Sequence, residues 1–373
     1  MIPGLDGLRA VAFLLVFGIH TGYLHIGWVG VQLFFVLSGF LITGILLDMK
    51  KKLPSKEYFL KFYGRRFLRI FPLYYFYLFA MLGISAGLIY ISYSPGFMRV
   101  FQNQFWYAVF YVYDFVTATS GFESSRFLGH LWSLSIEEQF YIFWPILVLL
   151  VPEKSLKKLF LAGIFAGPIF RIAISLIQHS GILPILKDPA SLAVYTLPFS
   201  HIDAFAFGAY ITRFSIPHSR RQLTFLGILL PIIGFTTHYV ATGSLGEITA
   251  FGFQVTMPDA YQFIWAYSLL NYWFAIIIYC VVHEKMFIQM LSWSPMRYLG
   301  KISYGLYVYH FPIIWFVAHI RESGMAEILA KPLIALIAFV STLIIASLSY
   351  FLMEKPLIRL KDRFFSLKSS SSS

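Results

Sequence analysis

Two ionisable side chains stand eleven residues apart in the first apolar segment of the chain. This segment reads GLRAVAFLLVFGIH and contains Arg9 and His20. Eleven helical steps bring both side chains to within about 20° of one face and separate them by about 16 Å along the axis. An imidazole deep in an apolar helix could act as a base or carry a transferred group. The alternative is an arginine that reaches the lipid headgroups and a histidine that hydrogen-bonds a neighbouring helix.

A second apolar segment, HLWSLSIEEQFYIFWP, carries two adjacent carboxylates, Glu137 and Glu138. Neighbouring residues diverge by about 100° on a helix, so we expect only one carboxylate to face the interior of a bundle. Ser133 lies four residues before Glu137 and shares its face, which favours Glu137. At a depth that matches His20, Glu137 could orient and stabilise the imidazole, with Glu138 in a supporting role. An ion pair that only joins two helices is the alternative.

Three arginines, Arg65, Arg66 and Arg69, lie where the chain re-enters an apolar segment. Arg66 and Arg69 share a helix face, and arginine forks suit phosphate groups. This cluster could therefore bind a phosphorylated cytoplasmic ligand. The alternative is a purely topological anchor on the cytoplasmic side of the membrane.

Further polar groups in apolar segments could either support a site or make satisfied contacts between helices. These groups are Arg171, Asp203, His201, His310 and Tyr307. The single cysteine, Cys280, lies in an apolar run, so it indicates neither an intramolecular disulfide nor a cysteine metal site. We expect no metal.

The composition of the 373-residue chain excludes a soluble protein. Hydrophobic residues make up 58% and charged residues 12%, and the mean hydropathy is +0.73. Soluble domains carry about 25% charged residues. We predict an all-α fold, a polytopic membrane helix bundle, because about ten segments are apolar over the length of a span. They are 7–24, 30–48, 68–91, 131–151, 156–178, 195–214, 222–241, 262–282, 301–320 and 331–353. A shorter aromatic stretch, 105–116, could span, re-enter or lie at the interface.

Lysine and arginine set the expected topology. With both termini in the cytoplasm, 22 of these residues fall on the inner side and five on the outer side. This bias explains the net charge of +12 through contact with anionic lipids, so nucleic acid is not needed as a partner. We expect a membrane domain over 1–360 and a disordered, polar cytoplasmic tail over 361–373.

In combination, these motifs resemble the acyltransferase-3 family of integral membrane O-acyltransferases. The arginine and histidine of the first span match Arg9 and His20, and GVQLFFVLSGFLITGILL resembles the second helix of the family. RFLR, SLSIEEQFY, DAFAFGAY and LGKISYGLYVYHFPI follow in the family's order, so the resemblance covers roughly 3–360. One departure is His201, which stands where the family pattern has an arginine.

The resemblance implies an O-acetyltransferase of the O-antigen or exopolysaccharide type, in a bacterial cytoplasmic (inner) membrane. An acyl group, acetyl in most relatives, would pass from cytoplasmic acyl-CoA to a hydroxyl of a carbohydrate-type acceptor outside. Arg9, Arg65, Arg66 and Arg69 would hold the CoA phosphates, His20 would be the base or the acyl carrier, and Glu137 its partner. No permanently bound cofactor is implied. A proton-coupled transporter is the alternative, because intramembrane His, Glu and Arg also build proton relays. The acceptor, the acyl length and the oligomeric state stay open.

Overall fold

A computed structural model of the chain describes residues 2–257, 259–322 and 331–365. These residues form helices joined by turns, with one isolated β-bridge between Thr119 and Leu186. Within this described part, seven helices are long and apolar enough to cross a membrane. The prediction of an all-α, polytopic membrane protein is therefore confirmed.

Three of the ten expected spans form shorter, broken or more polar helices. Helix α1 (Leu5–His20) has 16 residues, about 24 Å of rise, against the roughly 30 Å of a hydrocarbon core. The segment 195–214 is interrupted at a proline: α8 (Ala190–Thr196) is followed by η4 (Pro198–His201) and α9 (Ile202–Tyr210). Helix α14 (Ser303–Glu322) has 20 residues but carries polar side chains such as His310.

The aromatic stretch 105–116 does not form one helix. Helix α4 (Pro95–Val109) ends within it, Tyr111 turns the chain with a φ of 52°, and α5 (Tyr113–Thr117) follows. A left-handed residue of this kind ends a helix. The stretch is not among the candidate spans.

The expected boundary between membrane domain and tail falls inside a helix. Helix α16 (Lys355–Phe364) continues past residue 360. The end of the expected tail, 366–373, lies outside the described residues.

The chain divides into two compact units that alternate along the sequence. The first unit comprises 1–44, 114–122 and 151–303, and the second comprises 45–113, 123–150 and 304–373. Each unit is described by itself below.

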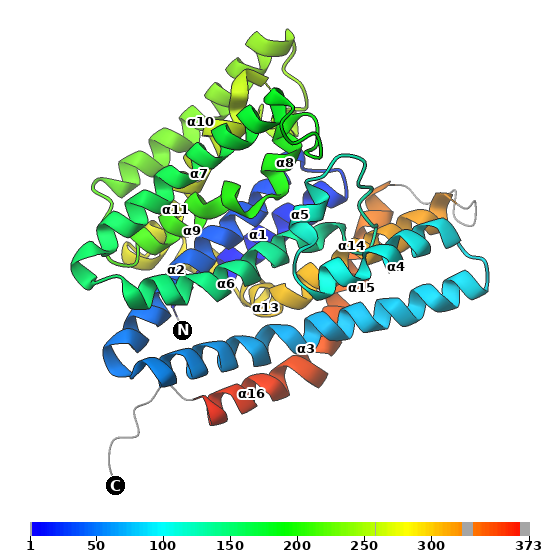
Figure 1. Cartoon of the computed structure of the whole chain (residues 1–373), viewed down its shortest axis with the longest axis horizontal. Coiled ribbons are helices and arrows are strands. Elements are labelled where there is room, and N and C mark those ends of the chain that lie inside the picture. Colours follow the sequence, from blue (N-terminus) through cyan, green and yellow to red (C-terminus); the bar gives the residue numbers. More distant parts are fainter. Residues whose placement is uncertain (1, 258, 323–330, 366–373) are drawn as a thin grey trace. The chain divides into compact units, whose positions relative to one another are not determined.

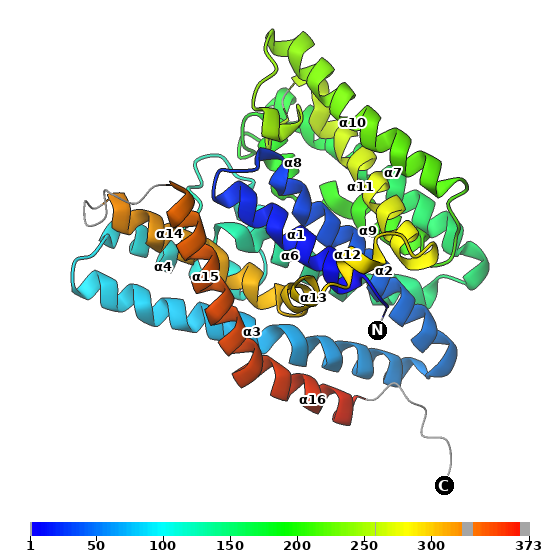
Figure 2. The ribbon, with the colours of Figure 1, turned by 180° about the vertical axis from the view of Figure 1, so that it is seen from behind.

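In the first unit, small residues let helices approach closely. Helix α2 (Val29–Lys52) crosses α9 where Gly39 faces the Phe205 backbone and Gly208 faces the Val36 backbone. A Cβ at either glycine would collide with that backbone, so only glycine permits this crossing. On the other side of the unit, α1 packs against α13 (Ser294–Lys301), as Figure 2 shows from behind.

The first unit is completed by three long helices. These are α7 (Leu156–Ser180), α10 (Ser219–Thr242) and α11 (Gln262–His283). A short turn that begins at Glu153 precedes α7. Helix α7 packs against α9 and α11, and α10 packs against α11 (Figure 1). Residues far apart in the sequence thereby meet at α9.

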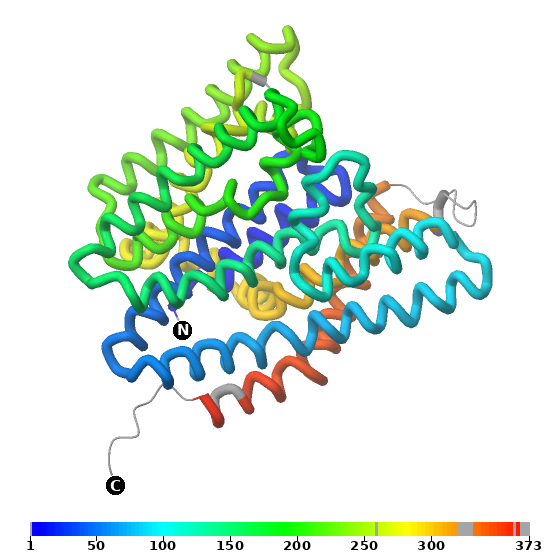
Figure 3. The backbone as a smooth tube through the Cα atoms, viewed as in Figure 1, coloured from blue at the N-terminus to red at the C-terminus, as the bar shows by residue number. Residues whose placement is uncertain are grey.

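In the second unit, α3 (Ser55–Tyr90) is the organising element. It has 36 residues and runs unbroken in the backbone trace of Figure 3. Five tyrosine hydroxyls on α3 donate to backbone carbonyls of neighbouring segments. They are Tyr58 to Pro145, Tyr63 to Ile142, Tyr74 to Ala108, Tyr75 to Val109 and Tyr77 to Phe127. Two of these segments belong to α6 (Trp132–Leu150) and α4, so hydrogen bonds fix α3 against both helices.

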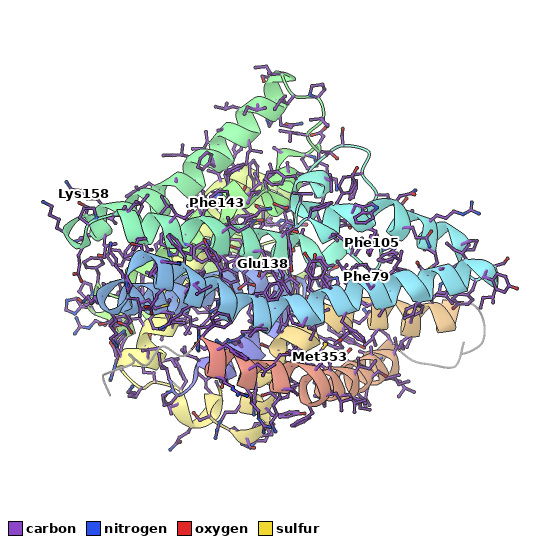
Figure 4. All side chains as sticks on the ribbon, turned by 60° about the horizontal axis from the view of Figure 1, so that its bottom comes forward. Phe79, Phe105, Glu138, Phe143, Lys158 and Met353 are labelled. Atoms are coloured by element: carbon purple, nitrogen blue, oxygen red, sulfur yellow. The ribbon has the colours of Figure 1, made fainter. Side chains whose placement is uncertain are left out.

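Aromatic contacts and the last helices complete this unit. The rings of Phe79 on α3 and Phe105 on α4 lie 5.7 Å apart, edge to face (Figure 4). Helix α15 (Lys331–Ser349) leads through a π-helical turn, η7 (Tyr350–Glu354), into α16, which packs along α3. The second unit therefore brings α4, α6 and α16 against α3.

Candidate functional site

Arg9 and His20 lie on the single uninterrupted helix α1, as the spacing argument requires. The Arg9 guanidinium is already engaged, because its Nη1 donates to Asp6 Oδ1 at 2.6 Å. His20 is the last residue of the helix, and its side chain is half-buried. Asp6 was not predicted, although an acidic residue three positions before an arginine is a recognisable helical pair.

The groups at Arg171 and Asp203 form one closed ionic contact in the first unit. Both side chains are 0% exposed. Arg171 donates from Nη1 and Nη2 to the two carboxylate oxygens, at 3.2 and 2.8 Å. Its other bonds go to the carbonyls of Ile264 and Ser200 and to the Ser268 hydroxyl. All five N–H donors of the guanidinium are thereby used.

The Asp203 carboxylate is equally well satisfied. Besides Arg171, Ser268 donates to Oδ2 at 2.6 Å and Asn271 donates to Oδ1 at 3.3 Å. Gly167 on α7 leaves room for the carboxylate, because a Cβ there would lie 2.5 Å from Asp203 Cγ. Arg171 and Asp203 therefore form a contact that joins α7, α9 and α11.

His201 has neighbours of its own. Its Nε2 lies 3.1 Å from the Tyr195 carbonyl, so Nε2 carries the proton and Nδ1 accepts from Gln32 Nε2 at 3.0 Å. The ring is fully buried beside Phe35 and Tyr267. His201 therefore links α2 to the start of α9.

Arg66 and the two glutamates of α6 come together in the second unit. The Arg66 Cζ atom lies 5.0 Å from the centre of the Tyr141 ring, and the guanidinium interacts electrostatically with Glu137 and Glu138. The Tyr141 hydroxyl donates to Glu137 Oε1. Glu137 is half-exposed, whereas Glu138, labelled in Figure 4, is 7% exposed. Tyr141 was not predicted, although it lies four residues after Glu137.

The other two arginines of the cluster have different surroundings. Arg65 Nη1 donates to the Phe365 carbonyl at 2.9 Å, next to α16. The Arg69 side chain is exposed and interacts electrostatically with Glu354 of η7. The three arginines therefore do not form one uniform patch.

A second polar group in this unit joins α6 to α14. The Ser133 and Tyr307 hydroxyls are 2.5 Å apart, and each lies within hydrogen-bond distance of the His130 carbonyl, at 3.0 and 3.1 Å. Each hydroxyl has one hydrogen, so one donates to the other and the second donates to the carbonyl. His310 Nδ1 lies 2.6 Å from the Tyr307 carbonyl, which makes it the protonated nitrogen. The structure thus brings together three residues that the sequence only suggested, Ser133, Tyr307 and His310, and adds His130.

The predicted site residues are divided between the units. Arg9 and His20 belong to the first unit, whereas the arginine cluster and both glutamates belong to the second. Among the residues that the structure describes, no group of three His, Cys, Asp or Glu side chains could hold a metal ion.

The family assignment rests on nearly the whole chain. The family described as "Acyltransferase domain" matches residues 2–351. The chain therefore belongs to the acyltransferase-3 family and is an integral membrane protein with several spans. No solved structure matches it.

Three bacterial relatives illustrate the similarity. YrhL of Bacillus subtilis, named provisionally as a peptidoglycan O-acetyltransferase, is 29% identical over 98% of this chain and 56% of its own length. The O-acetyltransferase OatA of Staphylococcus aureus is 26% identical over 95% of this chain and 57% of its own length. The peptidoglycan O-acetyltransferase OatA of Listeria monocytogenes is 28% identical, over 95% and 56%. The chain spans little more than half the length of these relatives.

Proposed function

We propose that this chain transfers an acetyl group from cytoplasmic acetyl-CoA to a hydroxyl of a cell-wall glycan on the outer side of a bacterial cytoplasmic membrane. The observation that carries the proposal is the family match over residues 2–351. The names of the relatives support a glycan of the peptidoglycan class as the acceptor.

His20 is the proposed centre of the reaction. As a base, it takes the proton of the acceptor hydroxyl while the hydroxyl oxygen attacks the thioester carbonyl carbon. The carbon–sulfur bond then breaks, and the CoA thiolate leaves and receives that proton. As a carrier, His20 attacks the thioester itself, releases CoA and passes the acetyl group to the hydroxyl in a second step.

Glu137 is the proposed partner of His20. Support comes from the matched depth of the two residues in their predicted spans and from the environment of Glu137 on α6. The Glu137 carboxylate accepts from the Tyr141 hydroxyl and interacts electrostatically with Arg66, and a carboxylate beside an imidazole can stabilise its positive form. Glu138 is more buried and is assigned a supporting role.

The arginines of α3 are the proposed site for the donor phosphates. Arg66 and Arg69 are the stronger candidates, because Arg65 donates to the Phe365 carbonyl. Arg9 is assigned a smaller share, since Asp6 offsets its charge.

Membrane vesicles test the proposal directly. Vesicles that contain the chain, radiolabelled acetyl-CoA and cell-wall glycan should yield covalently labelled glycan. His20→Ala should abolish the label while leaving membrane insertion intact. His179→Ala is the matched control, because this histidine is exposed near the end of α7.

Two outcomes would contradict the proposal. A well-inserted His20→Ala protein that labels glycan at the wild-type rate would remove His20 from the reaction. Movement of label across the membrane with no covalent product would favour the transporter.

A further experiment distinguishes the two roles proposed for His20. Acetylated protein that can be trapped in the absence of acceptor would indicate the acyl carrier and not the base.

A further inference from the structure

Helix α16 carries exposed apolar side chains where the chain leaves a membrane span. Leu360 is 39% exposed and Phe364 is 65% exposed, and Pro356 on the same face is exposed too. In the preceding α15 and η7, Leu348 and Leu352 are 55% and 76% exposed. Helix α15 belongs to a candidate span, so its exposed apolar side chains face lipid. At intervals of four residues, this lipid-facing apolar stripe continues into α16.

A stripe of cations runs beside the apolar stripe on α16. Lys355, Arg359 and Arg363 are also four residues apart, and each comes one position before or after a member of the apolar stripe. The two stripes are therefore about 100° apart around the helix. The Arg359 and Arg363 side chains are exposed, and that of Lys355 is half-buried. Over its whole length, KPLIRLKDRF, the helix has four cations and one carboxylate.

Cations and exposed aromatic rings meet at both ends of α16. Lys355 Nζ lies 5.2 Å from the centre of the Phe351 ring, and Arg363 Cζ lies 5.7 Å from the centre of the Phe364 ring. Both rings are largely exposed. At a bilayer surface such a ring enters the acyl boundary while the cation stays at the level of the phosphates.

The other side of α16 is held on α3. Leu357 and Ile358 are half-buried there, and α16 packs along the first part of α3 (Figures 1 and 2). Arg65 Nη1 donates to the Phe365 carbonyl at 2.9 Å. Gly64 leaves room for the Phe365 ring, because a Cβ there would lie 2.4 Å from it. These contacts fix the helix so that the apolar and cationic stripes point away from α3.

We propose that α16 lies in the headgroup layer of the membrane and binds anionic phospholipid. The apolar stripe lies at the acyl boundary, and Lys355, Arg359 and Arg363 contact the phosphates. Two observations select this occupant: the stripe continues the lipid-facing surface of α15, and the cations complement a negative surface. The expected topology places this end of the chain on the cytoplasmic side, where the leaflet is negatively charged. The inference does not depend on the proposed function.

Fluorescence quenching in vesicles measures where α16 lies. The full-length chain, with Cys280→Ala, carries one fluorophore at Leu360→Cys or at Phe364→Cys. Brominated phospholipid should quench both positions strongly and the water-soluble quencher acrylamide weakly, as at Ile344→Cys, a control position in α15 that is 53% exposed. Lys154→Cys, exposed in the turn before α7, should show the opposite pattern.

A second measurement tests the charge of the lipid. In mixed vesicles of constant composition, the bromine is carried either by phosphatidylglycerol or by phosphatidylcholine. The fluorophore at Leu360→Cys should show about a threefold preference for phosphatidylglycerol, and the one at Ile344→Cys none. Replacing Lys355, Arg359 and Arg363 with glutamine should abolish the preference. Arg359→Lys with Arg363→Lys should keep it, because ammonium keeps the charge.

Three results would overturn the inference. Quenching of both α16 positions mainly from water would place the helix outside the bilayer, and quenching from neither phase would mean that protein covers the stripe. Equal quenching by the two lipids in the chain with all three cations would remove the anionic headgroup as the occupant. Unchanged quenching at Ile344→Cys in the glutamine variant is the check that the chain remains inserted. None of these measurements involves acetyl transfer, so each outcome leaves the proposed function to its own test.

Discussion

In each compact unit an arginine interacts with carboxylates, but the guanidinium group has all its hydrogen-bond donors used in only one of the two. In the first unit, Arg171 uses all five N–H donors, and neither it nor Asp203 is exposed. In the second unit, the described contacts of the Arg66 guanidinium are with the Tyr141 and Phe62 rings, at 5.0 and 6.0 Å, and it shares its charge with two glutamates. A satisfied pair stabilises the fold, whereas a partly satisfied guanidinium can still bind a ligand. Residue type alone does not separate these roles.

The largest effect should follow from breaking the complete pair. Arg171→Gln leaves the buried Asp203 charge without its partner, which should cost about 3–5 kcal/mol of stability. We expect thermal unfolding of the purified chain at a much lower temperature. The double variant Arg171→Gln with Asp203→Asn removes both charges and should recover part of the loss. A single variant as stable as the wild type would contradict a structural role.

The next largest effect should come from the glutamates of α6, measured as acetyl transfer per inserted molecule. Glu137→Gln removes the charge proposed to stabilise a positive His20, so activity should fall by about 100-fold. Glu138→Gln should cost far less. If Glu138→Gln is the more damaging change, the face of α6 that points to the site is rotated by about 100° from our assignment.

A smaller effect on acetyl transfer should follow from replacing the arginines of α3, whose hydrogen bonding is incomplete. Replacing Arg66 and Arg69 together with alanine should raise the KM for acetyl-CoA about tenfold or more, because phosphate contacts are lost. A double lysine variant should recover only part, since ammonium keeps the charge without the fork. Arg65→Ala should raise the KM less, because that guanidinium bonds the Phe365 carbonyl. An unchanged KM in the double alanine variant would reduce the cluster to a topological anchor.

The smallest effect should come from a third, surface pair. Glu284 accepts from Ser219 and, at 2.5 Å, from Arg220, and these hydrogen bonds lower the pKa of Glu284 below its ordinary value of 4.5. A lowered pKa stabilises the folded chain above pH 4.5, and the contribution disappears as pH falls through the folded-state pKa. The Tm difference between wild type and Glu284→Gln should therefore be small at pH 7 and vanish in acid. A difference that grows in acid would contradict this assignment.

Spacing within one helix could be predicted from sequence, and so could the class of fold. Arg9 and His20 do lie on one helix, and so do Ser133 and Glu137. The long helices could be identified from the length of their apolar segments, because a span must cross the hydrocarbon core of the bilayer. The same helical spacing could have found Asp6 and Tyr141, three and four residues from their partners.

Contacts between helices could not be predicted in this way. Arg171 and Asp203 are 32 residues apart, and Arg65 and Phe365 are 300 apart. Periodicity gives the face of a helix but not the identity of the helix that packs on it. The π-helical turn at Glu354 was also missed, because its extra residue shifts the helical register by an amount that hydrophobic spacing does not reveal.

The tyrosines of α3 have a consequence for how this chain tolerates change. Their five hydroxyls bind main-chain oxygens, not side chains, of the segments around them. Every residue type supplies a carbonyl, so substitutions along α4 and α6 can alter size or polarity and still leave these anchors in place. The neighbours of α3 can therefore diverge in sequence while the long helix keeps its position. Among single side-chain changes at these contacts, it is replacement of a tyrosine that removes the hydrogen bond.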